Sequence, residues 1–144
     1  MRRAVVFATA EAAEEAFYDA LQRGDLADMM ALWADEEDVV CVHPSGPRLV
    51  GLAAIRASFE QIFAQGGVDV RPSETRRHQG AMLAVHTLVE KVLVTGQMGA
   101  EVVECVVTNA YVKTAAGWRI VLHHASPAGE SAPTNLAAGP AVLH

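Results

Sequence analysis

The stretch GDLADMMALWADEEDVVCVHPSGPRLVGLAAIRASF (residues 24–59) decides the fold, because it combines a helix, a short strand, a loop and a second helix. Asp25 has the short polar side chain of a helix N-cap, and apolar residues follow it at helical spacing. These features predict a helix over residues 26–35. The apolar run at 39–43 then predicts a short strand that ends in an ionisable ring, His43.

The second half of this stretch contains a loop and a helix. The segment PSGPRLVG (44–51) has two prolines and two glycines, which predicts a turn-rich loop. The residues that follow, 52–67, predict an amphipathic helix. Its buried stripe is expected to comprise Leu52, Ile55, Phe59, Ile62 and Phe63.

Regular structure is also predicted on both sides of the stretch. A first helix is expected over 10–24, because Thr9 is a suitable N-cap, acidic residues occupy the first turn, and Gly24 can end it. After Gly67 the chain becomes rich in Val, Thr and Leu, with turn signals between the apolar runs. Long strands joined by short turns pair antiparallel. Such strands are predicted at 68–79, 81–95, 100–114 and 117–125.

Three helices followed by an antiparallel sheet are typical of the α+β class, with the helices covering one face of the sheet. A chain of 144 residues has the length of one domain. We expect residues 1–126 to form that domain and residues 127–144 to be a C-terminal tail.

The composition excludes several classes of function. The net charge is −6 and no basic stripe occurs, which argues against a nucleic-acid partner. No segment approaches the roughly 20 apolar residues that span a membrane. Cys41 and Cys105 lie in apolar runs and are expected to be free, buried thiols of a cytoplasmic protein. Without a CxxC motif or a glycine-rich phosphate loop, we expect neither a metal site nor a cofactor.

Four motifs stand out along the chain: Gly24-Asp25, Trp33-Ala34-Asp35, Pro44 with Gly51 and Ile55, and Gly117-Trp118 leading to His124-Ala125-Ser126. Together, over residues 10–126, they resemble the SnoaL-like branch of the nuclear transport factor two-like superfamily. The resemblance implies a curved sheet wrapped on helices, forming a cone with a pocket at its wide end. Relatives include ketosteroid isomerases, polyketide cyclases, dehydratases, non-catalytic subunits and the association domain of a calmodulin-dependent kinase, so the fold alone does not imply one activity.

The resemblance does not supply the catalytic residues of these relatives. Ketosteroid isomerases carry an aspartate base before the proline, a tyrosine on the first helix and a protonated aspartate on a late strand. The matching positions here are His43, Phe17 and Asn109, and Tyr18 is turned about 100° away from Phe17 around the helix. The cavity aspartate of the cyclases has no match, because the chain has no Asp after Asp69. The Asp–Arg–Asp arrangement of the epoxide-hydrolase relatives is also absent.

His43 is the main candidate for chemistry. Pro44 favours an extended backbone at His43, so Val39, Cys41 and His43 should share one face of the strand. An imidazole with a pKa near 6.5 can accept or donate a proton at neutral pH. The alternative is a structural histidine hydrogen-bonded to a loop carbonyl.

Other polar residues in the predicted sheet are candidates as well. His86 interrupts an apolar strand and needs a partner, and Asn109 is the best hydrogen-bond donor, with Tyr111 on the same face. His123 and His124 are neighbours and must point to opposite faces. His124 is expected to share a face with Trp118, Ile120 and Leu122, in a structural role or as a ligand contact. A metal site of His43, His86 and His124 has no close-spaced motif to support it.

These observations predict a pocket for a small, mostly apolar organic molecule. If the protein is an enzyme, it is expected to be an isomerase or lyase, with His43 transferring the proton and with Asn109 and His86 orienting a carbonyl or hydroxyl group. The alternative function is a non-catalytic association module. We expect a homodimer formed through the outer face of the sheet, and no membrane partner. The residues expected to line the pocket are Phe17, Met29, Trp33, Phe59, Phe63, Tyr111 and His124.

Overall fold

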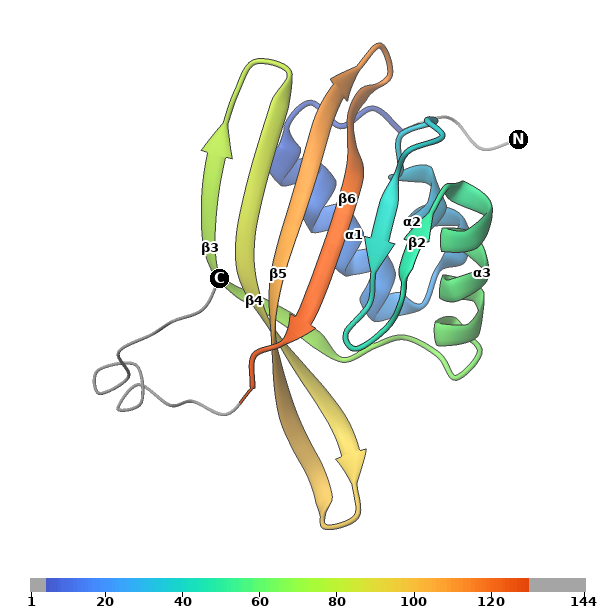
Figure 1. Ribbon diagram of the computed structural model, residues 1–144, viewed down its shortest axis with the longest axis vertical. Coiled ribbons are helices and arrows are strands. Elements are labelled where there is room, and N and C mark those ends of the chain that lie inside the picture. Colours follow the sequence, from blue (N-terminus) through green and yellow to red (C-terminus); the bar gives the residue numbers. More distant parts are fainter. Residues whose placement is uncertain (1–4, 130–144) are drawn as a thin grey trace.

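A computed structural model of the chain describes residues 5–129. It contains three helices and six strands in one α+β unit, as the sequence predicts (Figure 1). Most of the tail expected at 127–144 lies outside the described residues. The elements are α1 (Ala10–Arg23), α2 (Leu26–Ala31), β1 (Val40–Val42), β2 (Arg48–Val50), α3 (Leu52–Phe63), β3 (Val70–Gln79), β4 (Leu83–Gly96), β5 (Gly99–Thr114) and β6 (Gly117–Pro127).

The two ends of α1 are formed by the capping residues expected from the sequence. The Thr9 side chain accepts a hydrogen bond from the Ala12 amide at 3.0 Å. Gly24 adopts a left-handed conformation with φ of 68°, and its N–H donates to the Ala20 carbonyl. A Cβ at this position would also lie 2.9 Å from the Gly67 nitrogen, so glycine is required both for conformation and for close approach.

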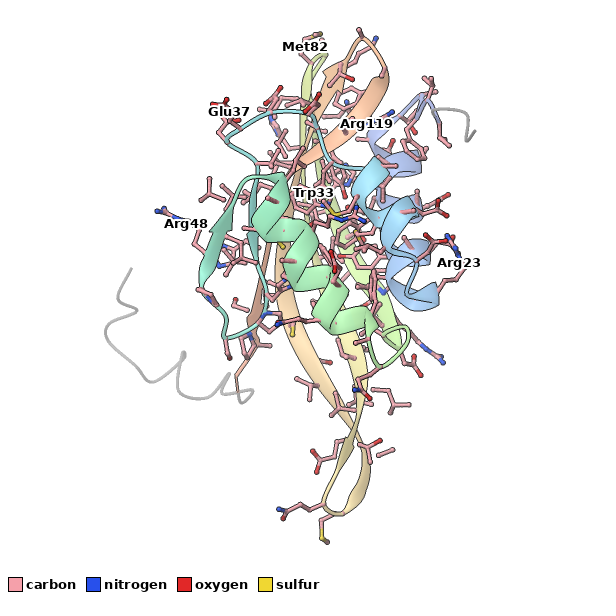
Figure 2. All side chains as sticks on the ribbon, turned by 90° about the vertical axis from the view of Figure 1, so that its right-hand side faces the viewer. Arg23, Trp33, Glu37, Arg48, Met82 and Arg119 are labelled. Atoms are coloured by element: carbon pink, nitrogen blue, oxygen red, sulfur yellow. The ribbon has the colours of Figure 1, made fainter. Side chains whose placement is uncertain are left out.

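The sheet has the order β2-β1-β6-β5-β4-β3. All neighbours pair antiparallel, as expected for the long strands, except that β1 runs parallel to β6. The sheet curves around the helices, and Figure 2 shows α1 and α3 over one face with side chains filling the space between the layers. The turn between β4 and β5 extends as a hairpin beyond the helices (Figure 1). The helices therefore cover one face of the sheet, as the sequence predicts.

Three predicted boundaries were wrong. The second helix ends at Ala31 instead of residue 35, because the next residues pair with β6: the Leu32 carbonyl accepts from the Ile120 amide, and the Ala34 amide donates to the Ile120 carbonyl, both at 2.9 Å. Part of the predicted loop is strand β2, which pairs with β1. The third helix ends at Phe63 instead of residue 67, because a turn at residues 64–65 and the glycines at 66 and 67 follow it.

The pattern of buried residues defines an inner face of the sheet that packs on the helices. Alternate residues of β4 and β5 are buried, and they include the polar residues His86, Glu90 and Asn109. Cys41 and Cys105 are free and buried, as expected. No helix within residues 5–129 is both long enough and apolar enough to cross a membrane.

A β-bulge changes the faces predicted for β6. Ala110 pairs with Leu122, whereas the next residue, Tyr111, pairs with Ile120, so Val121 is an extra residue on β6. The extra residue shifts the alternation of side chains by one position. Trp118 and Ile120 are therefore buried on the same face as His123, and His124 is exposed. The prediction that His124 shares a face with Trp118 and Ile120 was wrong for this reason.

Candidate functional site

A mostly apolar cavity of about 300 Å³ lies between the helices and the inner face of the sheet. Its polar wall residues are His43, Glu90 and His123, and none of the described residues that line it is a lysine or an arginine. The volume is at the lower end of the range for small-molecule sites, roughly 300–1,000 Å³. The full lining is Phe17, Leu21, His43, Pro44, Phe59, Ile62, Val68, Val70, Glu90, Val92 and His123.

His43 follows β1 directly and is half-buried against α3. Its ring meets the ring of Phe59 edge-on, with the centroids 5.0 Å apart. Its Nε2 atom lies 2.9 Å from Ser58 Oγ and 3.6 Å from Cys41 Sγ. Burial lowers the pKa of His43 below its usual value, since water no longer stabilises the imidazolium. At neutral pH this ring is uncharged and can accept a proton.

Glu90 brings a carboxyl group to the same cavity from β4. It is buried, and its Oε2 atom accepts a hydrogen bond of 2.7 Å from the Tyr18 hydroxyl. Burial raises the pKa of Glu90, and the hydrogen bond from Tyr18 offsets only part of that rise. The carboxyl group therefore holds its proton to higher pH than an exposed glutamate does.

His123 forms the third polar part of the wall, from β6. Its ring centroid lies 4.8 Å from that of Phe17, and its Nδ1 atom lies 2.7 Å from Asn109 Oδ1. Burial, with smaller contributions from the neighbouring His43 and His124, lowers the pKa of His123 to about 3. His123 is therefore neutral across the physiological range.

A second buried carboxylate lies on the far side of Asn109 from His123. Oε2 of Glu14, on α1, accepts hydrogen bonds from the Tyr111 hydroxyl at 2.6 Å and from Asn109 Nδ2 at 3.4 Å, and it lies 2.9 Å from His86 Nδ1. Asn109 Nδ2 also donates to the Tyr18 hydroxyl at 3.3 Å. Asn109 therefore links Glu14 directly to His123, and it links Glu14 to Glu90 through the Tyr18 hydroxyl. His86 Nε2 is buried and has no hydrogen-bond partner among residues 5–129.

The structure places the predicted site residues in three groups. His43, Phe17 and Phe59 line the cavity. Asn109, His86 and Tyr111 lie beside it in the buried network around Glu14. The remaining four do not line the cavity: Met29 and Trp33 are core residues, Phe63 packs on Phe59, and His124 is exposed on the outer face.

Sequence reasoning missed Glu14, Glu90 and Tyr18, and it chose His124 where His123 lines the cavity. A signal for Glu90 was present, because it shares the parity of Ala84, His86 and Leu88 on a predicted apolar strand face. Tyr18 was interpreted as turned away from the site, yet it is buried and hydrogen-bonded within it. Neighbouring helix positions can both be buried because the curved sheet wraps around α1: Phe17 lines the cavity while Tyr18 reaches β4 and β5.

The other parts of the described chain are weaker candidates for a functional site. No three His, Cys, Asp or Glu side chains within residues 5–129 are grouped so that they could hold a metal ion. A hollow of about 550 Å³ lies over the outer face, next to the bulge of β3. Its charged residues, Glu74 and Arg76, are exposed. The cavity that holds His43, Glu90 and His123 is therefore the candidate site.

Comparisons with known proteins agree with this fold. Residues 10–130 match the SnoaL-like domain. A candidate calcium/calmodulin-dependent protein kinase type II association domain from Thiobacillus denitrificans is 37% identical with a TM-score of 0.76, over 85% of this chain and 97% of that one. A candidate dehydratase of the NTF2-like family from Streptomyces avermitilis is 28% identical with a TM-score of 0.73, over 82% of this chain and 93% of that one.

A more distant structure shows the same fold. The CaMKII hub of S. rosetta is 21% identical with a TM-score of 0.66, over 81% of this chain and 92% of that one. Comparison with the curated proteins gave no match. Both the domain match and the identity to the Thiobacillus protein span most of the chain, so the protein belongs to the SnoaL-like family of the NTF2-like superfamily.

Proposed function

We propose that this protein binds a small, mostly apolar organic molecule and moves a proton on it, as an isomerase or lyase. The observation that carries the proposal is the pairing of His43 with Glu90 on one apolar cavity. Burial shifts their pKa values in opposite directions, which favours the neutral base at His43 and the protonated acid at Glu90. An uncharged base and a protonated acid on the wall of one cavity are the pair that general acid–base catalysis requires.

His43 acts as the proton acceptor in this proposal and Glu90 as the donor. His43 would remove a proton from carbon next to a carbonyl group, and Glu90 would protonate the oxygen that gains charge. Asn109 and His86, which were expected to orient the substrate directly, act instead through the hydrogen-bond network. The similarity to a candidate dehydratase supports the lyase class.

The test is hydrogen–deuterium exchange on simple ketones. Acetophenone and 1-indanone are incubated with the protein in D₂O, and the loss of the α-C–H signals is followed by ¹H NMR. We expect exchange above the buffer rate for the wild type and its loss in His43→Gln. The matched control is His78→Gln, an exposed histidine of β3, which should exchange as the wild type does. Equal exchange by His43→Gln and wild type would refute the assignment of the base.

A homodimer through the outer face of the sheet is part of the same proposal. Leu83, Leu93, Val102 and Val106 are exposed apolar residues with outward parity on β4 and β5. A face of this kind is typical of an interface between copies of a chain. We expect Val106→Arg to shift the species seen by light scattering from dimer to monomer. Gln61→Arg, exposed on α3, should leave a dimer. The free thiols of Cys41 and Cys105 support a cytoplasmic location.

A second candidate function, the association module, is favoured by the 37% identity to the candidate kinase association domain. A module without chemistry needs no acid–base pair, and its self-association extends beyond a dimer. Native mass spectrometry separates the two. A dimer that loses an organic mass on denaturation supports the pocket function, whereas a ligand-free assembly larger than a dimer supports the association module.

A further inference from the structure

The hydrogen bond made by Ser58 sets the tautomer of His43. The hydroxyl of Ser58 donates its single proton to the Ile55 carbonyl at 2.7 Å. Ser58 Oγ can therefore act only as an acceptor towards His43 Nε2, which lies 2.9 Å away. The neutral His43 ring then carries its proton on Nε2 and has a bare lone pair on Nδ1.

Asn109 sets the tautomer of His123 in the same way. The carboxylate of Glu14 only accepts, so the amide nitrogen of Asn109 must face it, and this nitrogen also donates to Tyr18. Asn109 Oδ1 is consequently directed at His123 Nδ1, 2.7 Å away, and can only accept. The neutral His123 ring carries its proton on Nδ1, and its Nε2 atom is a bare acceptor on the ring that lines the cavity.

The same chain of donors determines where the acidic proton of Glu90 lies. Tyr18 accepts from Asn109 and so directs its own proton to Glu90 Oε2. Because Oε2 already accepts a hydrogen bond, the proton of the Glu90 carboxyl group lies on Oε1 whenever that group is protonated. With Glu90 protonated, the three polar residues of the wall carry one acidic donor and two bare ring nitrogens, and the other lining residues are apolar.

We infer that Ser58 and Asn109 are positioning residues that fix these proton positions, and that the ligand is an uncharged molecule bearing a hydroxyl group. This inference rests on the proposed function and names the ligand class for the same cavity. A hydroxyl group both donates and accepts, so it can donate to a bare nitrogen and accept from Glu90. An anion finds no lysine or arginine among the described lining residues and would lose its hydration.

The tautomers are measured directly on the ligand-free protein by long-range ¹H–¹⁵N NMR with ¹⁵N-labelled histidine. His43→Gln and His123→Gln identify the signals of the two rings. We expect a protonated Nε2 for His43 and a protonated Nδ1 for His123. The opposite tautomer at either ring would overturn the inference. It would leave the proposed function standing, since the ketone exchange test measures proton transfer without reference to the tautomer.

Matched variants of Ser58 test its positioning role. Ser58→Ala removes the acceptor and should convert the His43 signals to a mixture of both tautomers. Ser58→Thr retains the hydroxyl and should keep the wild-type pattern. A merely structural role for Ser58 would lower stability in Ser58→Ala without changing the His43 tautomer. Unchanged His43 signals in Ser58→Ala would therefore refute the role of Ser58.

The ligand class is tested with three probes that share one ring system: 2-naphthol, naphthalene and 2-naphthoate. Calorimetric titration should show 2-naphthol binding about three- to tenfold more tightly than naphthalene, the effect of a single net hydrogen bond. The anionic 2-naphthoate should bind most weakly. Equal binding of 2-naphthol and naphthalene, or tighter binding of 2-naphthoate, would overturn the ligand class. Expected tautomers and probe binding without any ketone exchange would contradict only the proposed catalysis.

Discussion

The hydroxyl of Tyr18 donates a hydrogen bond of 2.7 Å to Oε2 of Glu90, between residues that are 72 positions apart in the chain. This contact joins α1 to β4 at the edge of the cavity. It satisfies one oxygen of a buried carboxyl group and partly offsets the rise in its pKa that burial causes. The acidity of the cavity therefore depends on a residue that does not itself line it.

Tyr18→Phe should raise the pKa of Glu90 further, because the hydrogen bond from Tyr18 lowers it. The variant also leaves Asn109 Nδ2 with one acceptor fewer, which should lower the free energy of unfolding by about 1–3 kcal/mol. The pKa is measured from the ¹³C shift of the Glu90 carboxyl group as a function of pH. A lower pKa in Tyr18→Phe would contradict the assigned direction of the hydrogen bond.

Glu14→Gln should destabilise the fold because Oε2 of Glu14 is the common acceptor for Tyr111 and Asn109. A glutamine can keep its carbonyl oxygen at this position, but a neutral amide accepts hydrogen bonds more weakly than a carboxylate, which costs about 1–3 kcal/mol over the two donors. Urea unfolding measures the change. Glu15→Gln is the control, because Glu15 is exposed on the same helix and should alter stability by less than about 0.5 kcal/mol.

The free energy of unfolding should decrease as the pH falls from about 6.5 towards 3. The folded protein holds His123 neutral down to a pKa of about 3. The unfolded chain binds a proton at that residue near pH 6.5. The unfolded state therefore binds more protons between these values, and stability rises with pH across that window.

The titration of Glu90 changes the free energy of unfolding with pH in the opposite direction to that of His123. Because the pKa of Glu90 is raised, the folded state binds more protons than the unfolded state at pH values just above the usual pKa of glutamate. The contribution of Glu90 to the free energy of unfolding therefore falls as the pH rises through that range. Urea titrations at several pH values measure the sum of these effects and of the lowered pKa of His43, which acts in the same direction as that of His123. The free energy of unfolding should decrease less between about pH 6.5 and 3 in His123→Gln than in the wild type. An equal decrease would show that the pKa of His123 is not lowered in the folded protein.

Ile62→Trp should fill the cavity from α3, since Ile62 lines it and is only partly buried. We expect naphthalene to bind at least about tenfold more weakly. The free energy of unfolding should change by no more than about 3 kcal/mol. Gln61→Trp introduces the same side chain at an exposed position of the same helix and should bind as the wild type does. Undiminished binding by Ile62→Trp would place the ligand elsewhere.

The sequence by itself determined the order and class of the elements. Caps such as Thr9 and Gly24 are local signals, because a helix end is decided by backbone groups within a few residues. The alternation of apolar residues in the long strands similarly identifies an inner and an outer face. The motifs also pointed to the correct superfamily, and they drew attention to His43, which does line the cavity.

The tertiary structure alone decided which side chains meet. The helix after Asp25 stops early because the backbone of Leu32 and Ala34 pairs with a strand almost 90 residues later. One extra residue at the bulge of β6 directs His123 inward and His124 outward. Such contacts depend on long-range register and on the curvature of the sheet, which no local pattern encodes. The proposed acid–base pair depends on that geometry, since burial, and not sequence position, shifts the pKa values of Glu90 and His43.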